Sequence, residues 1–168
     1  MNAKEYFQKQ LTSLHYLVDA ATKDLTDDEL NYTPPGTTNP VGLTWLHLLD
    51  SEDQFIAQLE TRKTIWEQAG WDQRLGFERL PRIGDDWHDL RANLMRVDDL
   101  LAYQEAIRQS TDAYLQNLTA DQFTQPVKFL SREVEIVDVL VLLISHSLFH
   151  AGEISNLRGV QGAQGLPF

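Results

Sequence analysis

The 168-residue chain contains no cysteine. Disulfide bonds, thiolate metal sites and reactions that need a cysteine nucleophile are therefore excluded. The absence permits a reducing compartment but says no more about where the protein works.

Long apolar runs are missing as well. The longest candidate, IVDVLVLLI at residues 136–144, is short and contains Asp138, whereas a membrane-spanning helix needs about 20 apolar residues. The N-terminal MNAKEYFQKQ lacks the apolar stretch of a secretory signal. We therefore expect a soluble cytoplasmic protein.

Basic residues are few and are scattered among acids. The chain has 14 Lys and Arg against 25 Asp and Glu, a formal net charge of −11. Proteins that bind a phosphate backbone usually present a basic patch, and none is visible here. We therefore expect neither nucleic acid nor an anionic membrane as a partner, and the acidity is most simply a solubility feature.

Strand patterns are scarce. The segment VKFLSREVEIV at residues 127–137 alternates, but it continues into a long helical pattern, so we predict no strand there. Elsewhere apolar residues recur with helical spacing. The predicted helices span about 3–24, 43–68, 100–118 and from Glu133 or Glu135 to about Val160. Together they predict an all-α four-helix bundle that forms one domain over residues 1–168.

Two connections have features of their own. Thr26 and Glu29 fit a capping box for a short helical turn, which the loop at 33–41 follows. Residues 71–92 mix Gly, Pro, Trp and charge without a sustained period, so we predict a long loop with one helical turn. Such a loop is either a functional lid or a surface excursion packed by its aromatic residues; these are Trp71, Phe77 and Trp87.

The last predicted helix carries two histidines on its core-facing side. Seven of its residues keep strict 4-3 spacing; they are Val139, Leu143, His146, His150, Glu153, Leu157 and Val160. Around them the helix is apolar nearly all round, which predicts that it is the innermost helix of the bundle.

His146 and His150 are one turn apart, so they are well placed to share a metal ion. The alternative is a pair of core histidines satisfied by hydrogen bonds. Glu153 follows on the same face and has several candidate roles: orienting an imidazole, a fourth ligand, or a general base on bound water. It could equally be a helix-end carboxylate in solvent or paired with Arg158.

A metal site needs a third ligand from another element. His88 lies in the irregular segment beside three aspartates, which favours a solvated side chain, and His15 flanks the apolar face of the first helix. His47 lies nearly opposite the main apolar stripe of the second helix, so periodicity alone leaves it as one candidate. Asp50, one turn further on, is the obvious substitute.

Three stretches together resemble the DinB/YfiT-like family of metalloenzymes. They are PVGLTWLHLLDSEDQFI at 40–56, the His-x-x-x-His pair of the last helix, and GEISNLRGVQGAQGLPF at 152–168. The resemblance implies a four-helix bundle with up-down-down-up topology, often dimeric. It also implies a divalent metal ion bound by one histidine of the second helix and two of the last, here His47, His146 and His150.

The implied ligand set has functional consequences. Three neutral imidazoles suit Zn²⁺ or Ni²⁺ and leave a position open for water or a substrate. The resemblance further implies a transferase or isomerase that uses a low-molecular-weight thiol and a small-molecule substrate. Glu153, from its place on the helix face, is the candidate for a supporting or catalytic role. The alternatives are a non-catalytic metal-binding or stress-response protein, and a helical interaction module with structural histidines. Arg158 could attract a carboxylate of such a thiol, but its position favours an exposed helix-end arginine.

Overall fold

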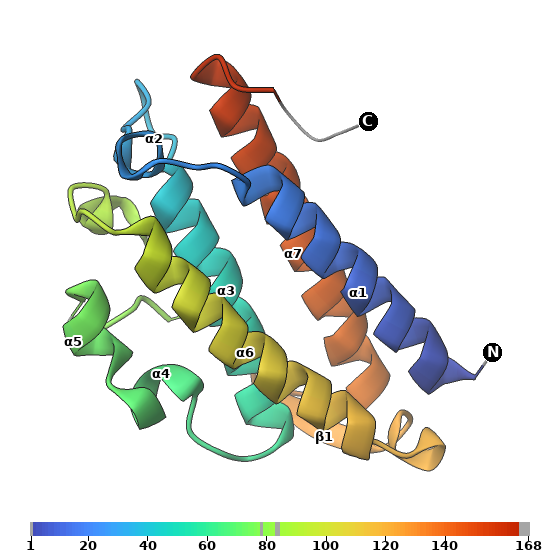
Figure 1. Ribbon diagram of the computed structural model, residues 1–168. Coiled ribbons are helices and arrows are strands. Elements are labelled where there is room, and N and C mark those ends of the chain that lie inside the picture. Colours follow the sequence, from blue (N-terminus) through green and yellow to red (C-terminus); the bar gives the residue numbers. More distant parts are fainter. Residues whose placement is uncertain (1, 78, 83–84, 165–168) are drawn as a thin grey trace.

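The computed structural model describes residues 2–77, 79–82 and 85–164. Four long helices form an up-down-down-up bundle (Figure 1); they are α1 (Ala3–Thr22), α3 (Val41–Leu59), α6 (Val97–Asn117) and α7 (Ile136–Val160). Helix α3 packs against both α6 and α7, and α1 packs against α7. The predicted helical bundle is therefore confirmed. Residues 165–168, which end the family-like C-terminal stretch, lie outside the described residues.

Shorter elements connect the long helices. They are α2 (Asp27–Asn31), α4 (Ile65–Ala69), α5 (Trp71–Leu75), 3₁₀ turns at His88–Leu90 and Ala120–Gln122, and the strands β1 (Pro126–Phe129) and β2 (Arg132–Glu135). The predicted capping box at Thr26 and Glu29 is present at the start of α2. The irregular segment holds α5 and a 3₁₀ turn, and its three aromatic residues are buried in the core.

The second predicted helix is wrong at its end. It was predicted to run to about residue 68, but α3 stops at Leu59 and the chain turns at Thr61, whose φ is 52°. The chain then doubles back as α4, because the buried Asp53 carboxylate accepts hydrogen bonds from the backbone N–H groups of Ile65 and Trp66. A side chain twelve residues upstream thus decides where the second segment begins.

The prediction that residues 127–137 contain no strand is also wrong. Strands β1 and β2 pair antiparallel, with Phe129 opposite Arg132. Leu130 and Ser131 form the turn with φ of 48° and 66°, as a two-residue primed turn requires. Such turns usually contain Asn-Gly or Asp-Gly, so Leu-Ser concealed the hairpin from sequence patterns. Phe129 is buried and its ring packs edge-on against Phe55 of α3.

Helix α3, and not α7, is the innermost helix. Of its 19 residues, 15 are buried, because α6 and α7 cover it from two sides. On α7 the predicted core position Val160 is 64% exposed. Four large apolar side chains of α7 also face outward; they are Val141, Leu142, Leu148 and Phe149.

The length and composition of α7 also bear on the expectation that no segment spans a membrane. Among the described helices, α7 is long and apolar enough for a span. Core helices of water-soluble bundles meet the same criteria. Here α7 packs against α1 and α3. Its residues His146 and His150 lie beside His47 of α3.

Candidate metal centre

His47 lies in the first half of α3, which is held tightly against its neighbours. At Gly42 an added Cβ would lie 2.9 Å from both Leu30 Cγ and Met95 Cε, so only glycine allows this approach to α2 and to the segment before α6. Trp87 then packs edge-on against the His47 ring with 4.8 Å between ring centroids. The approach at Gly42 therefore sets the position of α3, and the contact with Trp87 helps to place the His47 imidazole.

Helix α7 brings two more imidazoles to the same place. His146 and His150 are one turn apart with ring centroids separated by 4.5 Å. The His47 ring lies 5.1 Å from His146 and 4.8 Å from His150. One nitrogen from each of the three rings lies within 4.8 Å of the other two. The three histidines are therefore positioned to hold one metal ion.

The hydrogen bonding of these rings fits a metal site better than a pair of satisfied core histidines. Within the part of the chain that the structure describes, the buried Nδ1 atoms of His47 and His146 have no hydrogen-bond partner. A buried polar atom without a partner is costly, and most such atoms in folded proteins are paired. Coordination of a cation by these side chains would offset that cost.

Electrostatics keep two of the rings neutral. Burial, reinforced by the charge of His150, lowers the pKa of His47 and of His146 from 6.5 to about 4. Neutral imidazole is the form that binds metal, so at neutral pH no proton competes for these two rings.

Glu153 contacts the cluster through His150. The His150 Nδ1 atom lies 2.8 Å from Glu153 Oε2, one turn further along α7. If Nδ1 carries the proton, this bond orients the ring and leaves Nε2 free to bind metal. Glu153 is not paired with Arg158, which is buried and donates to the backbone carbonyls of Ala21 and Lys23. The expectation of an exposed helix-end arginine at 158 is therefore wrong.

The other candidate ligands from the sequence lie elsewhere. His15 Nε2 is 3.6 Å from Glu52 Oε1, and His88 is exposed in its 3₁₀ turn, as its aspartate neighbours suggested. Asp50 accepts a hydrogen bond from Gln54. In the described residues none of the three joins the histidine cluster.

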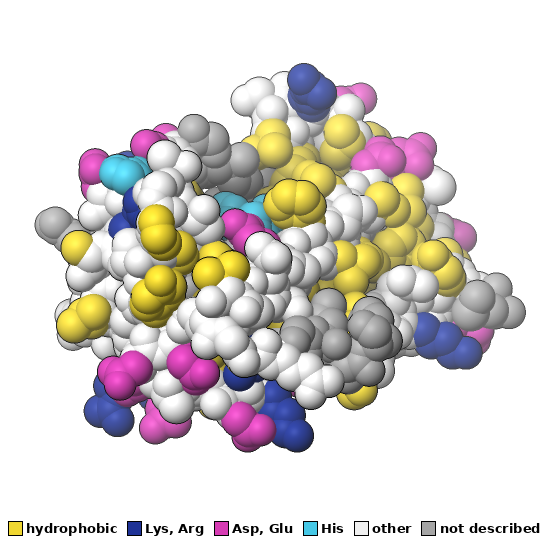
Figure 2. All heavy atoms as spheres, turned by 90° about the horizontal axis from the view of Figure 1, so that it is seen from above, with side chains coloured by type: hydrophobic (Ala, Val, Ile, Leu, Met, Phe, Trp, Pro, Cys, Tyr) yellow, Lys and Arg dark blue, Asp and Glu magenta, His cyan; other side chains and the backbone are white. Residues whose placement is uncertain are grey.

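An aromatic side chain lies near each ring of the cluster. Besides Trp87 on His47, Phe55 lies 6.0 Å from the His146 ring and Phe149 lies 5.4 Å from the His150 ring. Sequence reasoning missed this use of Trp87, because a contact between residues 40 positions apart leaves no local signal. The three histidines are partly exposed, and Figure 2 shows histidine atoms in a hollow between hydrophobic and acidic side chains.

Comparisons with known proteins agree with the fold. A crystal structure of a conserved protein from Enterococcus faecalis aligns with a TM-score of 0.82 and 22% identity over 97% of this chain and 99% of that chain. A DinB-like protein of Bacillus subtilis aligns with a TM-score of 0.58 and 18% identity over 98% and 95%. No curated protein sequence matches the chain. The family model of the DinB superfamily matches residues 10–154. The chain therefore belongs to the DinB superfamily.

Proposed function

We propose that His47, His146 and His150 bind one divalent ion, Zn²⁺ or Ni²⁺, and leave a coordination position open. The observation that carries the proposal is the meeting of three partly buried imidazoles, two of them with an unpartnered buried nitrogen. Nitrogen ligands of this kind suit both ions. Glu153 orients the His150 ring through the 2.8 Å contact.

We further propose that the protein is a metal-dependent enzyme of the thiol S-transferase or isomerase type. When bound, the ion would act as a Lewis acid that favours the thiolate form of a bound thiol. Because the chain has no cysteine, a low-molecular-weight thiol would be a cosubstrate. Trp87, which is buried and packed on the ring of His47, would limit the access of water to a bound thiolate.

The proposal extends to partners and location. The net charge of −11 argues against nucleic acid and anionic membranes as partners. The protein would instead act on a small-molecule substrate, and it would do so in the cytoplasm. The outward apolar face of α7 would be covered by a second copy of the chain, giving a homodimer.

The first test measures metal per chain by elemental analysis of untagged protein purified without chelator. We expect about one equivalent in the wild-type protein and none in the His146→Ala/His150→Ala variant. His88→Ala, which removes an exposed histidine outside the cluster, is the matched control and should keep its metal. If the wild-type protein binds neither Zn²⁺ nor Ni²⁺ after both are added back, the metal site is refuted.

The second test addresses catalysis. Metal-loaded protein is assayed with several thiols and a chlorinated aromatic electrophile. We expect thioether formation that the His146→Ala/His150→Ala variant lacks. Activity that is unchanged in this variant would refute the proposed mechanism even if metal binding is confirmed.

A further inference from the structure

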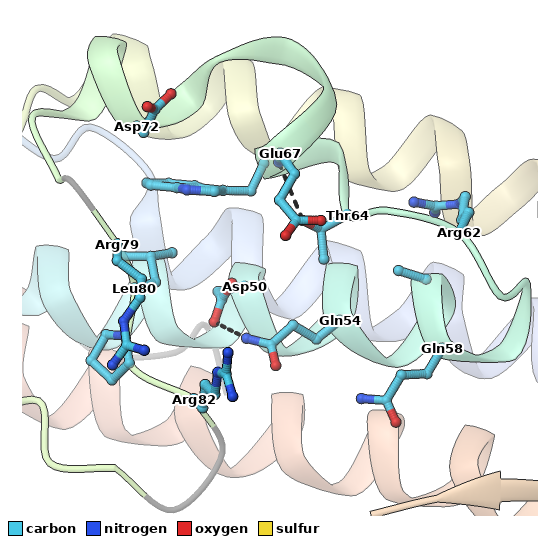
Figure 3. A pocket seen from close by; sticks show the side chains of 13 residues that line it. Asp50, Gln54, Gln58, Arg62, Thr64, Glu67, Asp72, Arg79, Leu80 and Arg82 are labelled. Carbon is cyan, nitrogen blue, oxygen red and sulfur yellow. Dashed lines mark hydrogen bonds between the residues drawn. The ribbon is translucent and has the colours of Figure 1, made fainter.

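A cavity of about 500 Å³ is lined in part by α3 but by none of the three histidines. Its walls come from three parts of the chain: α3, the α4–α5 pair, and the segment 79–82 (Figure 3). Asp50, on the α3 wall, follows His47 by three residues and so lies on the same side of the helix. A volume of this size suits a small organic molecule.

The cavity carries charges of both signs on different walls. Asp50 belongs to α3, and Glu67 and Asp72 belong to α4 and α5, whereas Arg79 and Arg82 belong to the facing segment. Arg62 also lines the cavity, but its guanidinium already binds Glu60, Ser110 and the Lys63 carbonyl.

Two of these groups have unused capacity for polar partners. Asp50 is only 4% exposed, and its carboxyl group accepts a side-chain hydrogen bond from Gln54 Nε2 at 2.5 Å. A carboxyl group has about four acceptor sites, so Asp50 can accept a hydrogen bond from a further donor. The Arg82 side chain is exposed, and its guanidinium has no ion-pair or hydrogen-bond partner among the described residues. In Figure 3 it points from its segment toward the Asp50–Gln54 pair.

Arg79 is less available, because its guanidinium lies 3.6 Å from the Asp85 carboxylate. Asp85 also accepts a hydrogen bond from the Arg82 backbone N–H at 2.8 Å. This bond helps to hold the backbone at Arg82 in place. Arg82 is therefore the cation best placed to meet a ligand in the cavity.

We propose that this cavity binds a small amphoteric molecule that carries an amino group and a carboxylate. The amino group would lie near Asp50 and Glu67, and the carboxylate would pair with Arg82. A ligand with both charges would meet the acidic α3, α4 and α5 walls with its amino group and the facing Arg82 with its carboxylate, whereas a singly charged ligand would pair with only one of them. This binding site goes beyond the proposed metal chemistry and does not depend on it.

Four tripeptides test the proposal. Trialanine carries both charges, N-acetyl-trialanine lacks the cation, trialanine amide lacks the anion, and N-acetyl-trialanine amide lacks both. Binding is followed by NMR through the indole N–H of Trp66 and the side-chain amide of Gln54, which both line the cavity. We expect trialanine to bind with a Kd of about 1 mM or tighter, and each singly blocked peptide to bind about tenfold more weakly.

Matched variants locate the binding. Arg82→Gln and Glu67→Gln should each weaken trialanine binding about tenfold, whereas Arg96→Gln and Glu133→Gln change exposed charges away from the cavity and should have no effect. Equal binding of all four peptides, or no binding by any of them, would overturn the proposal.

The His146→Ala/His150→Ala variant separates this proposal from the metal chemistry. Trialanine must still bind to this variant, because neither histidine lines the cavity. Binding that disappears with the histidines would assign the peptide to the metal centre and overturn the cavity proposal. A protein that binds no metal but binds trialanine would refute only the proposed function.

Discussion

At the residue scale, the contact between Glu153 and His150 decides how one imidazole can serve a metal ion. The carboxylate and the ring are one helical turn apart and 2.8 Å from each other. Carboxylates that hold the second ring nitrogen of a histidine ligand fix its tautomer and orientation. His47 and His146 have no comparable partner at Nδ1 among the described residues. His150 is therefore the ring whose direction depends most on a single neighbour.

We expect Glu153→Gln to lower the affinity for Zn²⁺ about 10- to 100-fold while leaving the fold intact. The amide loses the negative charge that stabilises the oriented ring. A competition titration with a chromophoric chelator measures the affinity, and Glu133→Gln in the hairpin is the control. An unchanged affinity would mean that the carboxylate does not support the site.

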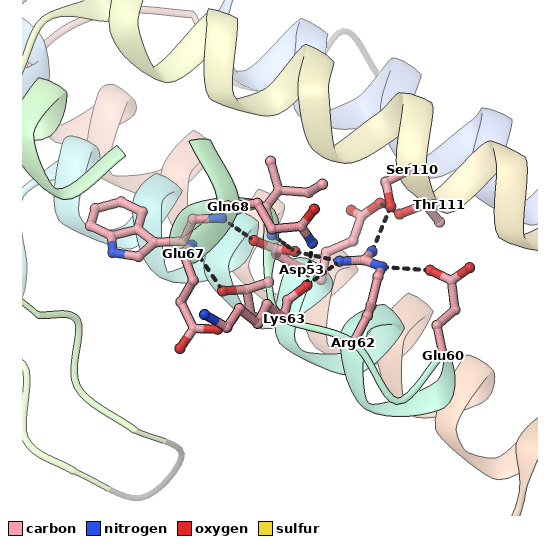
Figure 4. Close-up of polar contacts among 12 residues, drawn as sticks. Asp53, Glu60, Arg62, Lys63, Glu67, Gln68, Ser110 and Thr111 are labelled. Atoms are coloured by element: carbon pink, nitrogen blue, oxygen red, sulfur yellow. Dashed lines mark hydrogen bonds and ion pairs between the residues drawn. The ribbon is translucent and has the colours of Figure 1, made fainter. Parts of the chain in front are cut away.

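At the element scale, the Asp53 carboxylate holds α4 against α3. It accepts hydrogen bonds from the backbone N–H groups of Ile65 and Trp66 and from the Tyr103 hydroxyl, at 2.8 to 3.0 Å. Arg62 lies 3.8 Å from it (Figure 4). Burial raises the pKa of Asp53, while the hydrogen bonds from Ile65 and Trp66 oppose the rise. Helix α4 in turn forms a wall of the cavity, so this buried acid supports a proposed binding site.

Asp53→Ala should destabilise the protein by about 3 kcal/mol, because three donors lose their acceptor. Asp53→Asn keeps one acceptor oxygen and should cost less. Urea denaturation measures the free energy of unfolding, and Asp112→Ala on the exposed side of α6 is the control. A loss similar to that of the control would show that α4 is held by its apolar contacts alone.

At the scale of the whole molecule, burial of acids on the innermost helix affects stability. Burial raises the pKa of Asp50 from 3.8 to about 7, and the charge of Asp53 adds to the shift. Between these two pH values the folded protein keeps a proton that the unfolded chain has released. The contribution of Asp50 to the free energy of unfolding therefore falls as pH rises through this window.

Asp50→Asn should raise the free energy of unfolding at pH 8 by about 2 kcal/mol, and the gain should vanish below about pH 3, where both states hold the proton. Urea denaturation across this pH range measures the difference, with Asp112→Asn as the exposed control. A difference that does not vary with pH would contradict the raised pKa.

The outward face of α7 is the other feature of the whole molecule. Val141 and Leu148 are 51% and 40% exposed and lie two turns apart on this face. If this face forms the proposed homodimer interface, the double variant Val141→Lys/Leu148→Lys should be monomeric. Both introduced lysines would be buried in the interface, where they would face the same positive charges of the other copy. Light scattering after gel filtration measures the mass. Leu101→Lys, an exposed leucine on α6, is the control, and a monomeric wild-type protein would contradict the dimer.

The sequence by itself determined the features that depend on neighbours three or four residues apart. Helical spacing predicted the four long helices, Thr26 and Glu29 predicted the start of α2, and His146 and His150 were predicted to share a face of one helix. These features follow from side-chain periodicity and local hydrogen bonds, which act over one or two turns. The family resemblance added His47, which periodicity had left as one candidate among several.

Only the tertiary structure decided what depends on contacts between distant segments. The end of α3 at Leu59 depends on Asp53 reaching the start of α4, and the burial of Arg158 depends on the carbonyls at the end of α1. The contact of Trp87 with His47, and the cavity between Asp50 and Arg82, likewise join separate segments. Such contacts form when packed elements bring side chains together, and no local pattern in the sequence records them.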